Sequence, residues 1–110
     1  MITRFSVPNL HECTVNLANI AAHKISPELV LTNAKILSTY TDRIIDNKEI
    51  WISKGRIVCI KDTGSAKKIF NKDNFLLYDI NNNILAPGLI DPHMHIESSM
   101  MTACAYAEAA

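Results

Sequence analysis

Apolar positions early in the chain recur with helical spacing. The stretch "VPNLHECTVNLANIAAHK" carries them after a proline of the kind that opens a helix. The apolar residues at this spacing are Leu10, Leu17, Ile20 and Ala21. The pattern predicts a short helix within an N-terminal helical segment, residues 1–27. We expect the two histidines of this stretch, His11 and His23, to be exposed on the surface.

From Glu28 onward the pattern changes to short apolar runs with the length of strands. The runs are "LVLTNAKIL", "EIWIS", "RIVCI", "FLLYDI" and "NILAPGLID". Lys54 and Gly55 separate the second run from the third and predict a tight turn, because a glycine tolerates the backbone angles that such a turn needs. The sequence "EIWISKGRIVCI" therefore predicts a β-hairpin.

Polar stretches divide the later runs. Residues 63–74, "TGSAKKIFNKDN", predict a surface loop, and the three asparagines at 81–83 predict a turn between two further strands. Trp51 lies within a predicted strand without basic and aromatic neighbours in alternation, so we expect it to be a core or interface residue rather than part of a stacking surface. Residues 28–86 thus predict a small, mostly antiparallel β domain.

The last patterned stretch, "PGLIDPHMHIESSMM", begins as an alternating run. In an extended chain alternate side chains share a face. One face would carry Leu89, Asp91, His93, His95 and Glu97, and the other Ile90, Pro92, Met94 and Ile96. A polar face opposite an apolar one is typical of a strand in a barrel of alternating strands and helices, where active sites lie at the carboxyl ends of the strands.

The two histidines of this run have the spacing of a metal site. His93 and His95, at positions i and i+2, can bring two imidazole nitrogens to one ion, about 2.0–2.1 Å away if the ion is zinc. An H-x-H pair also occurs by chance in many chains. The residues around this pair favour a metal site. Asp91 on the same face can supply the hydrogen bond that fixes the tautomer of a metal-bound imidazole. The pattern P-G-L-I-D-x-H-x-H therefore predicts metal binding by His93 and His95 with Asp91 in support.

Composition narrows the class of protein. The chain has 110 residues, of which 48% are apolar, as expected for one packed globular unit. Its formal net charge is zero and its basic residues are scattered, which argues against a nucleic-acid or membrane-surface partner. Apolar runs are far shorter than the roughly 20 residues of a membrane helix, and the N-terminus lacks the order of a secretory signal, so we expect a cytoplasmic protein. The three cysteines form no C-x-x-C pair, so we expect each as a small buried residue.

The stretch "APGLIDPHMHIESSMMT" resembles the first barrel strand of the amidohydrolase superfamily, and "HIESSM" is similar to the adenine deaminase family in particular. The segment "ELVLTNAKIL", the hairpin around "KGRIVCI" and the helical segment before them are similar to the N-terminal portion of that family, so the resemblance covers about residues 10–110. It implies an α/β and β fold. A small N-terminal β-sandwich-like unit, residues 28–86, would lead into the first strand and the start of the first helix of a (β/α)8 barrel, residues 87–110.

The resemblance also implies a reaction, in which a metal-activated hydroxide attacks C6 of adenine, releases ammonia and leaves hypoxanthine. The implied cofactor is a dinuclear centre of Mn²⁺ or Fe²⁺, with Zn²⁺ as an alternative, and the implied partner is a small purine base. A homo-oligomer is possible, and the resemblance does not decide it. His93 and His95 match the first two ligands of the family. Glu97 matches a position near the site and is the one candidate catalytic residue here; it could brace the ligand loop, bond the substrate or cap a turn.

Members of this family are several times longer, and their other ligands come from later barrel strands: a carboxylate or modified lysine, two histidines and an aspartate. This chain ends in "TACAYAEAA", a helix former with Thr102 as its predicted N-cap, so we expect it to stop inside the first barrel helix. A catalytic barrel takes about 200 residues or more, so we expect these 110 residues alone to be inactive. Two alternatives remain: an amidohydrolase of cyclic amides, of dihydroorotase or hydantoinase type, and a non-catalytic truncated remnant.

Overall fold

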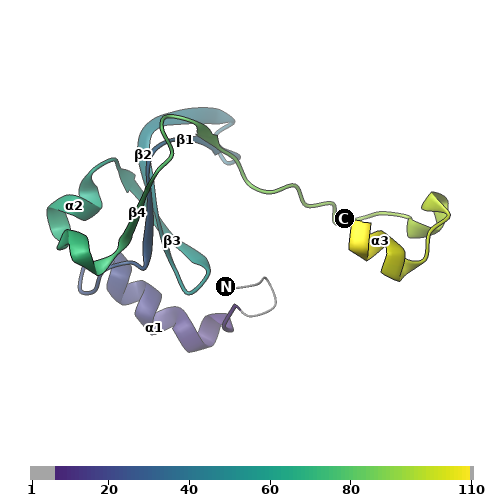
Figure 1. Ribbon diagram of the computed structural model, residues 1–110, viewed down its shortest axis with the longest axis horizontal. Helices are drawn as coiled ribbons and strands as arrows, with labels where there is room; N and C mark the ends of the chain where they lie inside the picture. The colour runs from purple at the N-terminus through teal and green to yellow at the C-terminus, as the bar shows by residue number, and fades with distance from the viewer. Residues whose placement is uncertain (1–6, 110) are drawn as a thin grey trace.

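The computed structural model describes residues 7–109; residues 1–6 and Ala110, the outer ends of the predicted N-terminal and C-terminal segments, lie outside the described residues. A five-stranded sheet forms the body of the molecule, and the C-terminal segment extends away from it (Figure 1). The strands are β1 (Leu29–Ser38), β2 (Arg43–Ser53), β3 (Arg56–Asp62), β4 (Leu76–Asp79) and β5 (Ile84–Leu85). The helices are α1 (Leu10–Ala21), α2 (Ser65–Ile69), the 3-10 turns η1 (Lys72–Asn74) and η2 (Ile96–Ser99), and α3 (Ala103–Ala109).

The sheet is mixed. Its strand order is β3-β2-β1-β4, and β5 also pairs with β1. The β1–β2 and β2–β3 pairs are antiparallel, whereas β4 and β5 run parallel to β1. The expected β-sandwich-like, mostly antiparallel unit is therefore a single mixed sheet within residues 7–109. The cause is the connection after β3, which passes through α2 and η1 and brings β4 to the other edge of β1 in the same direction as β1.

The hairpin predicted from "EIWISKGRIVCI" is confirmed. Lys54 and Gly55 join β2 to β3 with φ angles of 54° and 70°, the left-handed pair that suits the twist of a two-residue hairpin. The predicted asparagine turn also forms between β4 and β5. Asn81 and Asn82 have φ angles of 55° and 61°, and Asp79 Oδ1 accepts a hydrogen bond of 2.7 Å from the Asn81 N–H.

Helix α1 forms where the helical spacing predicted it. Cys13 and Ile20 are its buried residues. After its last turn His23 adopts a left-handed φ of 63°, a conformation that commonly ends helices. The ring of His23 then packs with its centroid 5.6 Å from that of Trp51. His23 is exposed, as expected, but it also covers a core aromatic residue.

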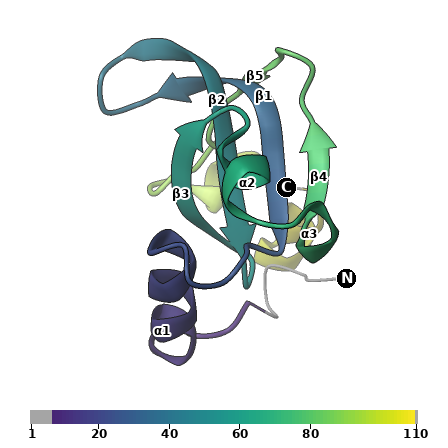
Figure 2. The ribbon, with the colours of Figure 1, turned by 90° about the vertical axis from the view of Figure 1, so that its left-hand side faces the viewer.

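The two faces of the sheet carry separate apolar clusters. Trp51 is fully buried in the first, as predicted, and this cluster receives Ile20 from α1 and Ala66 from α2. Helix α2 lies over this face (Figure 2). The second cluster includes Ile50; because neighbouring strand residues point to opposite faces, it lies on the other side of β2. In β1 the buried residues change face at Asn33, which has a φ of 53° next to a register shift in the pairing with β2.

The stretch 63–74 is more ordered than the surface loop we expected, because it contains α2 and η1. A buried carboxylate explains the difference. Glu49, from β2, is 1% exposed, and its two oxygens accept the Gly64 N–H at 2.8 Å and the Ala66 N–H at 2.7 Å. They also accept the Trp51 Nε1–H at 2.8 Å and the Thr32 hydroxyl at 3.3 Å. The carboxylate thus satisfies the free N–H groups at the start of α2 and ties this segment to the sheet.

The cysteines differ from one another in burial. Cys13 is buried and Cys59 is half-buried, and burial raises the pKa of the Cys59 thiol. Cys104 is exposed on α3, so the expectation of three buried cysteines is wrong at that position. Its helix, α3, lies away from the sheet (Figure 1).

The strand predicted over the alternating run after Pro87 does not form: residues 86–95 adopt no strand, and the chain leaves the sheet without pairing (Figure 1). A strand needs a neighbour to accept and donate its backbone hydrogen bonds, and the described residues offer none at this place. The apolar side chains of the run are correspondingly uncovered, with Leu89 and Ile90 at 105% and 87% exposure.

Candidate functional site

The candidate site lies in the segment that leaves the sheet after β5, just before η2. Asp91 Oδ1 accepts a hydrogen bond of 3.2 Å from the backbone N–H of His93. A short polar side chain that bonds the backbone two residues ahead forms a local turn. The sequence predicted that Asp91 would bond an imidazole ring; the structure instead shows it ordering the backbone that carries His93.

The two histidines of the H-x-H pair face one another. Nε2 of His93 lies 3.2 Å from Nε2 of His95, and the ring planes are inclined by 70° with their centroids 5.1 Å apart. Two ring nitrogens at this distance either share a proton or coordinate one ion. Two nitrogens each about 2.1 Å from one ion, with an angle of roughly 100° between the bonds, lie about 3.2 Å apart. The spacing of the pair therefore fits two ligands of a single metal ion.

Glu97 completes the local arrangement. Its Oε1 lies 2.7 Å from Nδ1 of His95, on the side of the ring opposite to Nε2. The sequence left three roles open for Glu97: bracing the ligand loop, bonding the substrate or capping a turn. In the structure Glu97 contacts His95, one of the two predicted metal ligands. His95 and Glu97 have side chains 64% and 73% exposed, so the contact is accessible to solvent.

The backbone after the pair is held by short polar caps. The Ser99 hydroxyl donates to the Ile96 carbonyl at 2.6 Å and accepts the Met101 N–H at 3.3 Å. Thr102 Oγ1 accepts the Ala105 N–H at 3.2 Å, which confirms Thr102 as the N-cap of α3. These bonds fix the turn that follows Glu97 and lead the chain into the helix.

The pair is an incomplete metal site. Residues 7–109 hold no group of three or more His, Cys, Asp or Glu side chains arranged for a metal ion. A protein-bound transition metal takes about four ligands or more. His93 and His95 can therefore hold a metal only together with ligands from outside this cluster.

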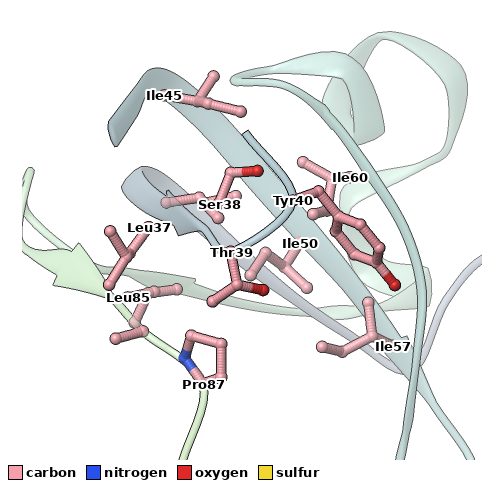
Figure 3. Close-up of a pocket in the computed structure, with 12 residues that line it drawn as sticks. Leu37, Ser38, Thr39, Tyr40, Ile45, Ile50, Ile57, Ile60, Leu85 and Pro87 are labelled. Carbon is pink, nitrogen blue, oxygen red and sulfur yellow. The ribbon is translucent and has the colours of Figure 1, made fainter. Parts of the chain in front are cut away.

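A second concave feature lies on the face of the sheet opposite α2. It is a hollow of about 330 Å³ lined by β1, β2 and β3, by the connection between β1 and β2, and by the start of the C-terminal segment (Figure 3). Its lining is mainly aliphatic, with Ile36, Ile45, Ile50, Ile57, Ile60 and Leu85 as the main residues. The polar side chains among its lining residues are hydroxyls, of Ser38, Thr39 and Tyr40. The hollow offers apolar contact but no carboxylate, imidazole or amine for acid-base or metal chemistry.

Comparison with known proteins gives the segment its context. No family model matches the chain. The adenine deaminase of Bradyrhizobium sp. strain BTAi1 is 52% identical over 109 residues, 99% of this chain and 18% of that protein. Adenine deaminase 3 of Rhizobium johnstonii is 51% identical over the same length, with the same coverage. The resemblance to adenine deaminase is confirmed. The chain spans about a fifth of the length of the adenine deaminases it matches, which is consistent with an N-terminal portion.

Two further observations add little to this resemblance. A solved structure of a Bacillus thuringiensis protein aligns with 63% of this chain and 89% of its own, with a TM-score of 0.43 and 23% identity. A likeness this weak does not establish a shared fold. Among the described residues no helix is both long and apolar enough to cross a membrane.

Proposed function

We propose that this chain is the N-terminal portion of an adenine deaminase, which converts adenine and water to hypoxanthine and ammonia. The observation that carries the proposal is the 52% identity to an adenine deaminase along 99% of the chain. The paired imidazoles of His93 and His95, with Nε2 atoms 3.2 Å apart, support it from the structure. Under this proposal the segment from Pro87 onward is the start of a (β/α)8 barrel, and its exposed apolar side chains are covered by barrel strands and helices.

In this proposal His93 and His95 hold a metal of a dinuclear Mn²⁺ or Fe²⁺ centre, with Zn²⁺ as an alternative. A metal held there would supply a water molecule acidic enough to provide hydroxide near neutral pH, the chemistry that hydrolysis at C6 of the purine needs. Each imidazole must be neutral and must offer its Nε2 lone pair, because a protonated nitrogen cannot bind a metal. Asp91 orders the backbone before the pair, and the Ser99 and Thr102 caps order it afterwards. The remaining ligands and the proton donor for the leaving ammonia come from the rest of the polypeptide.

A chimera tests the proposal. Residues 1–110 of this chain replace the matching 109-residue segment of the Bradyrhizobium BTAi1 adenine deaminase. We expect the manganese-loaded chimera to deaminate adenine, because a chain with the family's ligands should complete the site of a relative. The measurement is the ultraviolet loss of adenine with parallel detection of ammonia.

The parent deaminase is the positive control, and a chimera with both His93 and His95 replaced by alanine is the negative control. Circular dichroism and gel filtration establish that each protein is folded. A folded chimera that leaves adenine unchanged under conditions in which the parent consumes it would contradict the proposal and favour the non-catalytic remnant.

A further inference from the structure

Glu97 makes a contact that the proposed reaction does not itself require. Its Oε1 lies 2.7 Å from Nδ1 of His95, while Nε2 of the same ring faces His93 at 3.2 Å. The two ring nitrogens of His95 therefore have different partners. One meets a carboxylate, and the other meets the position where a metal ion would lie.

These two partners determine where the ring proton must be. A neutral imidazole carries one N–H, and an ionised carboxylate can only accept a hydrogen bond. A contact of 2.7 Å with Glu97 therefore requires the proton on Nδ1 of His95. The Nε2 atom then has its lone pair free and directed towards His93. The alternative tautomer would place an N–H on Nε2, where it blocks coordination, and would leave two lone pairs facing one another at Nδ1.

We propose that Glu97 is a positioning residue that fixes His95 in the Nδ1–H tautomer and thereby raises the affinity of the site for its metal. The inference rests on the proposed function only in taking His95 as a metal ligand. Carboxylates that orient a metal-bound imidazole in this way typically change metal affinity by about 10–100-fold when they are removed.

The local backbone holds Glu97 in reach of the ring. His95 has extended backbone angles, φ −105° and ψ 94°, and η2 begins at the next residue. The Ser98 N–H donates to the His95 carbonyl at 3.2 Å, which closes the chain back on itself. This turn brings the side chains at positions i and i+2 to the same side. The hydrogen bond of Asp91 in this segment is with the backbone N–H of His93 rather than with the ring of His95.

The zinc affinity of the metal-free chimera tests this role without any measurement of activity. Competition with a chelator compares the chimera with its Glu97→Ala, Glu97→Gln and Glu108→Ala variants. We expect Glu97→Ala to weaken zinc binding by about 10–100-fold. Glu97→Gln should recover most of the affinity, because its amide oxygen still accepts from Nδ1. Glu108→Ala removes an equal charge from an exposed position on α3 and should leave the affinity unchanged.

Nitrogen NMR measures the tautomer of the His95 ring directly. A purely structural role of Glu97 would leave that tautomer unchanged. The chain contains four histidines, so joining ¹⁵N-histidine-labelled residues 1–110 to the unlabelled remainder leaves four labelled rings. At pH 8.5, above the usual titration range of imidazole, we expect His95 to be the Nδ1–H tautomer, and Glu97→Ala to shift it towards Nε2–H.

The outcomes separate this inference from the proposed function. Zinc affinity unchanged in Glu97→Ala, or a wild-type His95 protonated on Nε2, would overturn the role of Glu97 even in an active deaminase. A chimera that binds zinc in the expected order of variants but leaves adenine unchanged would refute the proposed reaction and support the role of Glu97.

Discussion

Replacing either His93 or His95 with alanine in the chimera is expected to remove most of the bound manganese and to lower kcat by about 10³-fold or more. The two Nε2 atoms are 3.2 Å apart, so under the proposed function each would supply one bond to the same ion and neither could substitute for the other. A metal that polarises its bound water contributes several kcal/mol to transition-state stabilisation, and each 1.4 kcal/mol is about a factor of ten in rate.

Metal content by elemental analysis is the primary measurement, and adenine turnover is the second. His11→Ala is the matched control, because it removes an imidazole that is 80% exposed on α1 and should change neither quantity. Full metal content in both the His93 and the His95 variants would refute the metal assignment. Loss of turnover with normal metal content would point to a role in binding the substrate.

The parts of the fold that were predictable are those specified by local sequence. The hairpin needs only the two apolar runs and the left-handed pair Lys54 and Gly55 between them. The N-cap of α3 depends on Thr102 and the N–H three residues later. Each of these signals lies within a few residues of the structure it specifies, so one sequence is enough to detect it.

The errors in the fold depend on contacts between distant residues. Helix α2 has only five residues, Ser65–Ile69. Its alanine and lysines are good helix formers, but a helix this short is not stable without contacts from elsewhere in the fold. Its anchor is Glu49, 15 to 17 residues earlier in the chain. Glu49 begins the apolar run "EIWIS" and lies in the second half of β2, and glutamates are rarely buried unless they are paired. The local sequence therefore gave no reason to place Glu49 in the core.

In the candidate site, too, the features set by local sequence were predictable and those that depend on distant neighbours were not. The sequence paired His93 with His95 from their spacing, and their rings do face one another; metal binding by the pair stays a prediction. The strand on which they were placed does not form, since its backbone would need neighbours that residues 7–109 do not provide. The histidines still converge, because the Asp91 turn and η2 hold the segment locally. The contact between Glu97 and Nδ1 of His95 was not itself one of the three roles left open for Glu97, because the sequence does not show which side chain a carboxylate in a turn will meet.

Glu49 also carries the largest expected effect on stability. Alanine at this position leaves the Trp51 Nε1–H and the Ala66 N–H buried without their acceptor, and it removes the acceptor of the Gly64 N–H. Each buried donor left unsatisfied costs about 1–3 kcal/mol, so we expect Glu49→Ala to lower the free energy of unfolding by about 3–5 kcal/mol. The free energy of unfolding of a small domain is only about 5–15 kcal/mol in total, so this variant would lose a large share of its stability.

Urea denaturation of the chain measures this effect directly, because Trp51 is the only tryptophan and reports the affected contacts by its fluorescence. Glu49→Gln keeps one acceptor oxygen but turns an NH₂ group towards N–H donors, so we expect an intermediate loss of about 2 kcal/mol. Asp46→Ala is the matched control on the same strand. Its carboxylate is 73% exposed and lies 3.9 Å from Lys35, and an exposed pair of this kind is worth less than about 1 kcal/mol. If Glu49→Ala shifted the denaturation midpoint no further than Asp46→Ala, the carboxylate would not be what holds α2 to the sheet, and the order of residues 63–74 would have to come from apolar packing of Ala66 against Trp51 alone.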